Sequence, residues 1–465
     1  MFMVSQMGIT RDLAEFCIHS NYKDLPGEVI DKAKYFMLDF IGVAARGSVV
    51  ESSRVIYELI RSLGEDSKGS VIIGTGMRAA PQYAALANGA SAHSIEMDDV
   101  NNAASLHPGV TNFPVAVGIG ELAKTDGKKV IEAVILGYEV TIRLGKALGP
   151  SEHYGRGFHP TATCGAFGAT IVAAKIMGLD ESQMINALGI VGSMASGTME
   201  CLDENAWTKK MNPGWSAHNG VMAALLAKKG FRASSTIIEG EHGFLHMGSG
   251  HPSPEKVVDG LGLFYEIART SIKPHACCRY KQGPIDAILK IIRENDVNPQ
   301  EVEKVTLGIL KTGIPFVVKP EEKKYAPKSL IEAQFSMPFG AAMAILYGRA
   351  GLEEYIPEKW ESLEVKKMMA RVSCVEDPEL EKDYPQKWPA TAEIRTKDGR
   401  TFFARIDYPK GDPENPLSWE ELIEKFDKLT EPIYSEDRRD KIIKKIQQLE
   451  KEEDITNLTT LFIKD

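Results

Sequence analysis

The sequence predicts a mainly α-helical fold in which a large helical domain is interrupted by a smaller α+β domain. From Thr10 to about Gly262, apolar residues recur at the spacing of one helix face, and Gly and Ala are frequent between them. Near Tyr265 the pattern changes to short alternating segments, and helical spacing returns after residue 409. We therefore expect a helical domain formed by residues 1–265 and 409–465, with an α+β domain at 266–408.

The first part of the helical domain contains a series of predicted helices. Thr10 is the expected N-cap of the first, and Pro26 precedes the second. Asp180 with Gln183 three residues later matches a capping box. Four further helical segments share a high content of small residues: 81–97, 114–125, 127–148 and 180–197. Small side chains let helix backbones approach closely, so we expect a compact bundle.

The α+β domain is predicted from three strand-like segments and one helix. The segments 303–310, 391–396 and 401–409 are rich in β-branched and aromatic residues. The last two are joined through Asp398-Gly399, a turn sequence typical of β-hairpins. A helix is expected at 333–348, and the C-terminal helices at 418–429 and 435–454.

Composition restricts the class of partner. The formal net charge of -9, without a basic tail, argues against nucleic acid and acidic membrane as partners. A local basic pocket in an acidic protein still suits a small anion. Six scattered cysteines without a C-x-x-C pair indicate a reducing compartment, so we expect a cytoplasmic protein. The chain has no uninterrupted apolar run of the about 20 residues that a membrane helix needs.

An acidic segment, "HSIEMDDVNNAASLHPGV" at 93–110, supplies the first candidate site residues. They are Glu96, Asp98, Asp99 and His107. The acids could be solvated or cap a helix, or they could take part in binding or catalysis. Their spacing matches no standard metal-ligand pattern, so no metal is expected.

Basic residues beside glycines form the second group of candidates. Arg156 and His159 lie in "YGRGFHPTATCGAFGA", where the loop leads into a helix of small residues whose N-terminus suits an anion. A buried structural histidine is the alternative reading of His159. Lys209 and Lys210 precede a Pro-Gly step, and two such lysines are commonly only surface charge.

The segment "SIKPHACCRYKQG" at 271–283 lies where the two predicted domains meet, and clefts commonly form at such junctions. Its candidates are Lys273, His275, Cys278, Arg279 and Tyr280; the alternative is an exposed basic linker. Together the basic groups and the acidic segment suit a small polycarboxylate. Histidines among them suit proton transfer next to a carboxylate.

Several of these motifs resemble the MmgE/PrpD family: "AHSIEMDD…LHPG", "GFHPTATCGAFGA", "TKKMNPGWSAHNG", "KPHACCRY" and "EAQFSMPF". The resemblance runs through nearly the whole chain. It implies a helical domain, an α+β lid domain, a homodimer, an active site between the domains, and chemistry without metal or organic cofactor. The positions that match the family's site are Glu96, His107, His159, Lys209 and Lys273.

Three departures from the family pattern affect the expected activity. Val100-Asn101 stand where dehydratase-like members carry Thr-His, Cys278 stands where decarboxylases carry a histidine, and Asn212 stands where a histidine is common. The first hypothesis is a cofactor-independent lyase most like 2-methylcitrate dehydratase, an enzyme of propionate catabolism. The alternatives are a cis-aconitate decarboxylase, an epimerase of a dicarboxylate such as iminodisuccinate, and a non-catalytic carboxylate-binding dimer.

Roles follow from the lyase hypothesis. Lys209, Lys273, Arg156 and Arg279 would hold substrate carboxylates. His107 and His159 would serve as acid and base in an order that the sequence leaves open, and Glu96 would orient or tune one imidazole. Substrate contacts are also expected from a further group of candidates: Asp98, Asp99, Lys210, His275, Cys278 and Tyr280.

Overall fold

A computed structural model describes residues 8–202 and 206–464, and these form two compact units. Unit 1 contains the described residues up to Ser94, then Asp98–Thr270, and then those from Ser418 onward. Unit 2 contains Ile95–Met97 and Ser271–Leu417. The chain therefore leaves unit 1 for three residues inside the acidic segment before returning to it.

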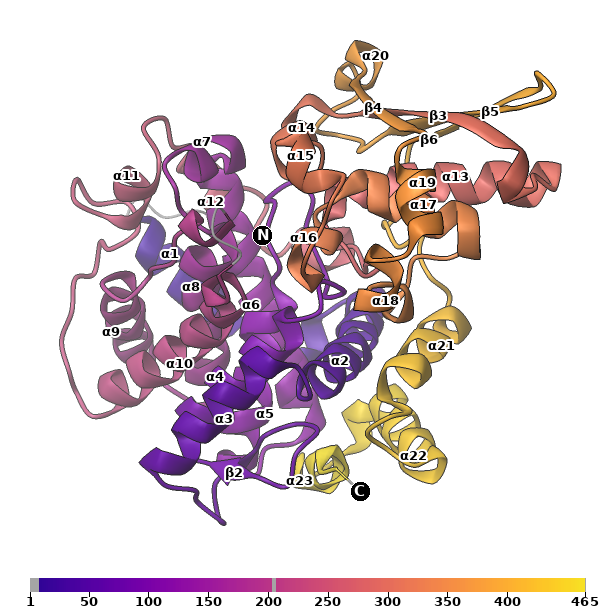
Figure 1. Ribbon diagram of the computed structural model, residues 1–465. Coiled ribbons are helices and arrows are strands. Elements are labelled where there is room, and N and C mark those ends of the chain that lie inside the picture. The colour runs from indigo at the N-terminus through magenta and orange to yellow at the C-terminus, as the bar shows by residue number, and fades with distance from the viewer. Residues whose placement is uncertain (1–7, 203–205, 465) are drawn as a thin grey trace. The chain divides into compact units, whose positions relative to one another are not determined.

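Unit 1 is built mainly of helices, with one short antiparallel strand pair (Figure 1). Its helices are α1 (Ile9–His19), α2 (Gly27–Gly47), α3 (Glu51–Leu63), α4 (Pro81–His93), α5 (Gly109–Ala123), α6 (Gly127–Leu148), α7 (Pro150–Gly155), α8 (Pro160–Met177), α9 (Glu181–Gly192), α10 (Thr208–Lys228), α11 (Phe244–Gly248), α12 (Glu255–Val258), α21 (Trp419–Thr430), α22 (Glu436–Gln447) and α23 (Thr456–Thr459). The strands are β1 (Ser70–Val71) and β2 (Arg78–Ala79).

Glycine allows the helices at the centre of unit 1 to pack at close range. α10 packs along both α4 and α8. At the crossing of α4 and α10, a Cβ added to Gly89 would lie 2.8 Å from the Cα of Gly214. A Cβ on Gly214 would lie 2.1 Å from the Leu86 carbonyl oxygen. The small-residue pattern therefore fixes the distance between these two helices.

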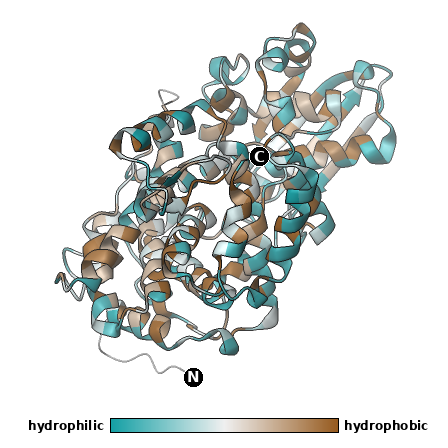
Figure 2. Cartoon of the chain, turned by 90° about the horizontal axis from the view of Figure 1, so that it is seen from below, coloured by the Kyte–Doolittle hydropathy of each residue, from teal (hydrophilic) through white to brown (hydrophobic). Residues whose placement is uncertain are grey.

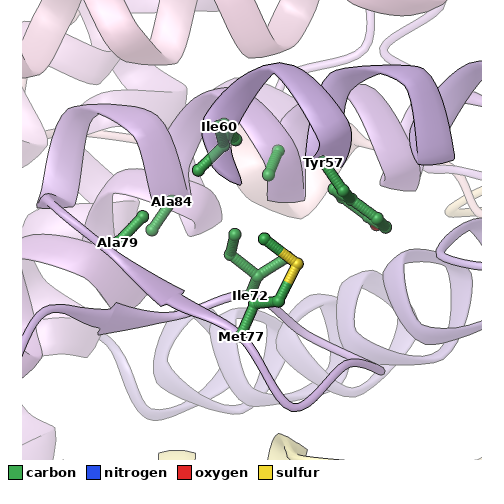
Figure 3. Packing of buried hydrophobic residues seen from close by; sticks show 7 residues of the cluster. Tyr57, Ile60, Ile72, Met77, Ala79 and Ala84 are labelled. Carbon is green, nitrogen blue, oxygen red and sulfur yellow. The ribbon is translucent and has the colours of Figure 1, made fainter. Parts of the chain in front are cut away.

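A second part of the core lies between α3 and α4 (Figure 3). Tyr57 and Ile60 of α3 pack with Ile72 and Met77 from the β1–β2 connection and with Ala84 of α4. The Tyr57 hydroxyl lies 2.6 Å from the Ser91 hydroxyl. This hydrogen bond satisfies a buried polar group, which would otherwise cost stability, and it ties α3 to α4.

Unit 2 contains a four-stranded sheet with the order β4-β3-β5-β6. Its strands are β3 (Val302–Ile309), β4 (Val372–Glu376), β5 (Ala390–Thr396) and β6 (Thr401–Ile406). β3 is parallel to β4 and antiparallel to β5, and β5 pairs with β6 as the predicted hairpin. Gly399 has φ 89°, the left-handed conformation that its turn requires.

Helices cover one side of this sheet, where α13, α17 and α19 lie in Figure 1. The helices of unit 2 are α13 (Gln282–Asn295), α14 (Ile314–Val317), α15 (Glu321–Lys324), α16 (Leu330–Gln334), α17 (Met337–Tyr347), α18 (Pro357–Trp360), α19 (Leu363–Met369) and α20 (Pro378–Glu381). The helix predicted at 333–348 is divided, because Ser336 caps α17 by accepting from the Phe339 N–H. The sequence analysis missed β4, a five-residue strand whose position depends on its pairing with β3.

Local corrections concern one helix cap and the unit boundaries. Gly8, not Thr10, is the N-cap of α1, and the Thr10 hydroxyl instead donates to Glu239. The predicted capping box at Asp180 and Gln183 is confirmed. The units change at Thr270 and Leu417, five and nine residues after the boundaries expected at 265 and 408. Glu266 remains with unit 1, where its N–H donates to Glu139.

Hydropathy varies along the chain in the way expected for packed helices. Figure 2 shows hydrophobic stretches within helices and hydrophilic residues in many loops and outer helix turns. α22 buries Ile442, Ile443 and Ile446 while most of its other side chains are charged, so it packs by one face. Among residues 8–202 and 206–464, the helices include none that combines the length and apolar character of a membrane span.

Candidate active site

Four segments of unit 1 bring chemically active side chains together. His93 is the last residue of α4, and Asp98 lies in the loop that follows. His107 ends that loop just before α5, His159 is the N-cap of α8, and Lys209 lies in the first turn of α10. All are buried except His107, whose side chain is 12% exposed. The tight packing of α4, α5, α8 and α10 therefore places this group.

One carboxylate connects two of the histidines. The Asp98 Oδ2 lies 2.7 Å from the His93 Nδ1 and 3.1 Å from the His107 Nδ1. The rings of His93 and His107 meet edge to face with centroids 5.0 Å apart, and the ring of His159 lies 5.8 Å from that of His93. Asp98 was predicted to contact substrate; in the structure it orients imidazoles.

The hydrogen bonds of His107 determine which ring nitrogen carries its proton in the neutral form. Its Nδ1 lies 2.6 Å from the Asp99 carbonyl oxygen, which can only accept. The proton is therefore assigned to Nδ1, and Nε2 has a lone pair. Among the described residues, none is hydrogen-bonded to Nε2 of His107. Because the side chain is also partly exposed, its Nε2 is suited to accept a proton.

His159 has the opposite arrangement. Its backbone N–H donates to the Gly197 carbonyl at 3.0 Å, and its Nδ1 lies 3.3 Å from the Asn212 Nδ2. The same amide nitrogen lies 3.5 Å from the Thr198 carbonyl oxygen, so the amide is oriented with its NH₂ group toward both acceptors. Nδ1 of His159 therefore accepts, and its proton is assigned to Nε2.

Lys209 lies next to the histidine group, with its Nζ 3.0 Å from the His93 Nε2. One nitrogen from each of His93 and His107 and one oxygen from Asp98 lie within 4.8 Å of one another, a spacing that could hold a metal ion. An ammonium in contact with one of these ligands opposes binding of a cation. The geometry favours a hydrogen-bonded acid–base group.

Asp99 is turned toward the core. Its carboxylate accepts from the Gly109 N–H at 3.0 Å and from the Tyr138 hydroxyl at 2.7 Å. Burial raises the pKa of Asp99 to about 8, and the Tyr138 hydrogen bond opposes this rise. Asp99, predicted to contact substrate, here fixes the loop whose carbonyl group orients His107.

Two of the predicted site residues pair within unit 2. The Lys273 Nζ lies 3.4 Å from the Glu96 Oε2, and both side chains are buried. Glu96 has φ 57°, a conformation that non-glycine residues rarely adopt. The neighbouring Ile95 carbonyl accepts from Gln334, so this short segment is held at both positions.

Other predicted residues of unit 2 have partners within the protein. Arg279 is buried and donates to both carboxylate oxygens of Asp412, at 2.6 and 2.7 Å. His275 lies 2.9 Å from Asp286. Tyr280 stacks on Trp388 with centroids 4.7 Å apart. The carboxylate that Arg279 holds here is thus that of the protein itself, and Tyr280 belongs to an aromatic cluster.

The remaining candidates differ in exposure. Arg156 is exposed and donates to the Met247 carbonyl. Lys210 is buried beside Lys209 in α10. Cys278 has a buried thiol, and its backbone N–H donates to the Gln334 carbonyl. Among residues 8–202 and 206–464, Arg156 makes no hydrogen bond or ion pair with the histidine group of unit 1.

Sequence reasoning missed two residues of this group, His93 and Asn212. His93 stands at the start of the acidic segment, five residues before Asp98. That spacing is only a weak indication of a contact between the two side chains, because residues five positions apart meet only when the chain turns after a helix. Asn212 was noted as a departure from the family pattern, but its contact with His159 depends on how α10 packs.

Comparison with known families bears on the same residues. Residues 11–256 match the MmgE/PrpD N-terminal domain, and residues 275–451 match the MmgE/PrpD C-terminal domain. This chain belongs to the MmgE/PrpD family. The resemblance inferred from its motifs is confirmed. The members of the group, from His93 to Asn212, all lie within the N-terminal match.

Curated relatives cover almost the whole chain. A cis-aconitate decarboxylase of Aspergillus terreus (strain NIH 2624 / FGSC A1156) is 28% identical over 477 residues, covering 98% of this chain and 96% of the relative. The cis-aconitate decarboxylase of Homo sapiens is 26% identical over 449 residues, covering 94% and 91%. That of Mus musculus is 25% identical over 445 residues, covering 93% and 89%.

Proposed function

We propose that this MmgE/PrpD protein is a cofactor-independent lyase that eliminates water from a small hydroxylated di- or tricarboxylate. The observation that carries the proposal is that the hydrogen bonds of His107 and His159 assign them opposite tautomers, while both rings lie against that of His93. His107 presents an unprotonated Nε2, and His159 presents a protonated one. An elimination of water needs one group that accepts a proton and one that donates it.

The reaction follows from these two nitrogens. The His107 Nε2 takes the proton from the carbon next to a carboxylate, and the electrons of that C–H bond form the double bond. The C–O bond breaks on the neighbouring carbon, and the hydroxyl leaves as water with the proton from the His159 Nε2. The Lys209 ammonium stabilises negative charge on the carboxylate as the proton is removed.

A hydroxylated tricarboxylate such as 2-methylcitrate is the first substrate candidate, because it contains both the acidic C–H and the leaving hydroxyl. Cis-aconitate decarboxylation is the second, supported by the names of the relatives. Decarboxylation needs a proton donor to the carbon that loses CO₂, but it needs no base. The acid–base pair therefore favours dehydration, as does Cys278 where decarboxylases carry a histidine.

The remaining expectations from the family resemblance are part of the proposal. Lys273 would hold a substrate carboxylate, with Glu96 as its partner within unit 2. The protein would act as a cytoplasmic homodimer. Sedimentation of the purified protein would test the dimer independently of its activity.

The test is an ultraviolet assay of purified protein with 2-methylcitrate, citrate and cis-aconitate, followed by identification of the products. A growing absorbance of a conjugated acid from either hydroxy acid would support dehydration. Release of CO₂ from cis-aconitate would replace the proposal with decarboxylation. Substrate that gains solvent deuterium without forming an unsaturated product would indicate an epimerase. Binding without any turnover would favour a non-catalytic carboxylate-binding protein.

A further inference from the structure

We infer that His93 is a positioning residue that holds Lys209 for a substrate carboxylate, through a neutral imidazole anchored by Asp98. The inference rests on the proposed function, since it concerns the same site. His93 has no exposed surface, and both of its ring nitrogens have a polar partner. Its role would be to orient the charge that binds the substrate.

Proton positions follow from the two partners. A lysine ammonium only donates, so the His93 Nε2 that faces Lys209 at 3.0 Å must be the unprotonated nitrogen. The proton then lies on Nδ1 and is donated to Asp98 at 2.7 Å. A hydrogen bond of this kind from histidine to carboxylate fixes both the tautomer and the ring orientation. The Lys209 ammonium therefore donates a hydrogen bond to His93, and His93 donates one to Asp98.

A neutral imidazole beside Lys209 leaves the positive charge of the lysine available, whereas a carboxylate there would not. An aspartate in contact with Lys209 would form an ion pair and cancel much of the positive charge at this position. The imidazole of His93 orients the ammonium but adds no negative charge of its own. The ammonium then keeps its attraction for an anionic substrate, while Asp98 is held one ring away.

Packing explains why the position of Lys209 depends on this contact. Lys209 lies in the first turn of α10, and His93 is the last residue of α4, 116 positions earlier in the chain. The flexible lysine side chain needs a partner from another helix to define its direction. The glycines at the crossing of α4 and α10 bring these helix ends close enough for that partner to be a histidine.

Two conservative substitutions separate this role from simple core packing. In His93→Gln, the side-chain amide reaches the position of Nε2, so its oxygen can accept from Lys209. In His93→Asn, the shorter amide reaches the position of Nδ1, so its nitrogen can donate to Asp98 while the acceptor for Lys209 is lost. A purely structural histidine would give no reason for the two variants to differ in affinity for an anion.

The experiment measures binding of tricarballylate by calorimetry, with KM and kcat where a substrate has been found. Tricarballylate is a tricarboxylate without a hydroxyl or a double bond, so it binds without reacting. We expect its Kd to rise about 10- to 100-fold in His93→Asn, the equivalent of one hydrogen bond to a charged group. In His93→Gln the Kd should stay within about 3-fold of that of the unmodified protein. The loss in His93→Asn should fall on KM more than on kcat.

A double-mutant cycle supplies the control. On a Lys209→Met background, His93→Asn should change the Kd no further, because the group that it positions is gone. Equal losses in His93→Asn and His93→Gln, or additive losses with Lys209→Met, would overturn the inference.

One further measurement uses the unmodified protein, so its result does not depend on whether a variant folds. ¹⁵N NMR of labelled histidines should show His93 protonated at Nδ1 and unprotonated at Nε2, and the reverse tautomer would overturn the inference. Failure of the proposed function is distinguishable from this: the unmodified protein would then bind tricarballylate but convert none of the hydroxy acids. If it binds no tricarballylate, the positioning role for a tricarboxylate is refuted as well.

Discussion

Replacing Gly214 with alanine should separate the two helices that bring Lys209 to His93. The added Cβ would lie 2.1 Å from the Leu86 carbonyl oxygen and 2.8 Å from the Ala90 nitrogen. Both are backbone atoms of α4, so no side-chain rotation can relieve the contact. Since Cβ atoms essentially never approach within 3.0 Å, the helices must part by about 0.9 Å, the difference between 3.0 and 2.1 Å.

The sign of the stability change depends on this contact. Alanine is favoured over glycine in an isolated helix by about 1 kcal/mol, so the substitution would be stabilising if α10 were free. Overpacking of a well-packed core typically costs about 1–3 kcal/mol, which exceeds that gain over most of its range. The net loss is then up to about 2 kcal/mol, and we expect the melting temperature to fall by up to about 8 °C.

The same displacement acts on the site. Parting by about 0.9 Å would lengthen the 3.0 Å contact between Lys209 and His93 beyond hydrogen-bonding distance. A misplacement near 1 Å in a catalytic group can lower activity about 100-fold. We therefore expect a matching loss of turnover, together with weaker tricarballylate binding.

Melting by circular dichroism and tricarballylate calorimetry provide the assays, and Gly155→Ala provides the control. Gly155 ends α7, has no atom within 4 Å of an added Cβ, and has an ordinary negative φ. That variant should melt and bind like the unmodified protein. If Gly214→Ala matches the control in both assays, the close crossing of α4 and α10 does not set the geometry of the site.

Three further predictions concern the proton donor His159, the buried carboxylate of Asp99 and the ion pair of Arg279 with Asp412. His159→Ala should lower turnover about 100-fold or more if His159 donates a proton, and an unchanged rate would remove that role. Asp99→Asn should become more stable relative to the unmodified protein as pH rises from about 4 toward the folded pKa of about 8. The sign follows because the raised folded pKa makes the folded state bind more protons than the unfolded state in this window, so the unmodified protein loses stability. A difference in melting temperature that is constant with pH would contradict it. Asp412→Ala should destabilise unit 2 by about 3–5 kcal/mol, because it leaves the Arg279 charge buried without its carboxylate. Limited proteolysis should then cut unit 2 faster, and Arg279→Met combined with Asp412→Leu should restore part of the resistance.

Features that depend on residues close together in the chain could be predicted from the amino-acid sequence. Helical periodicity, the capping box at Asp180 and the Asp398-Gly399 turn are local, because their hydrogen bonds close within a few residues. The motifs of the acidic segment and of the Gly-rich His-Pro loop also indicated the family, which the comparison with known families confirmed. They identified His107 and His159, and the motif "TKKMNPGWSAHNG" identified Lys209, as candidates that the fold then brought into one group with His93.

How those candidates are used depends on contacts between residues that are far apart in the chain. The contact between Lys209 and His93 joins residues 116 positions apart, and that between Arg279 and Asp412 joins residues 133 positions apart. No local pattern encodes such pairs, because they depend on which helix faces meet and at what distance. Packing turned Asp99 toward Tyr138 and gave Arg279 a carboxylate from within the protein. It also gave His107 and His159 hydrogen-bond partners that assign them opposite tautomers. The sequence supplied candidate acids and bases, and the folded chain gave them their hydrogen-bond partners: loop atoms for His107, and residues of α10 for His93 and His159.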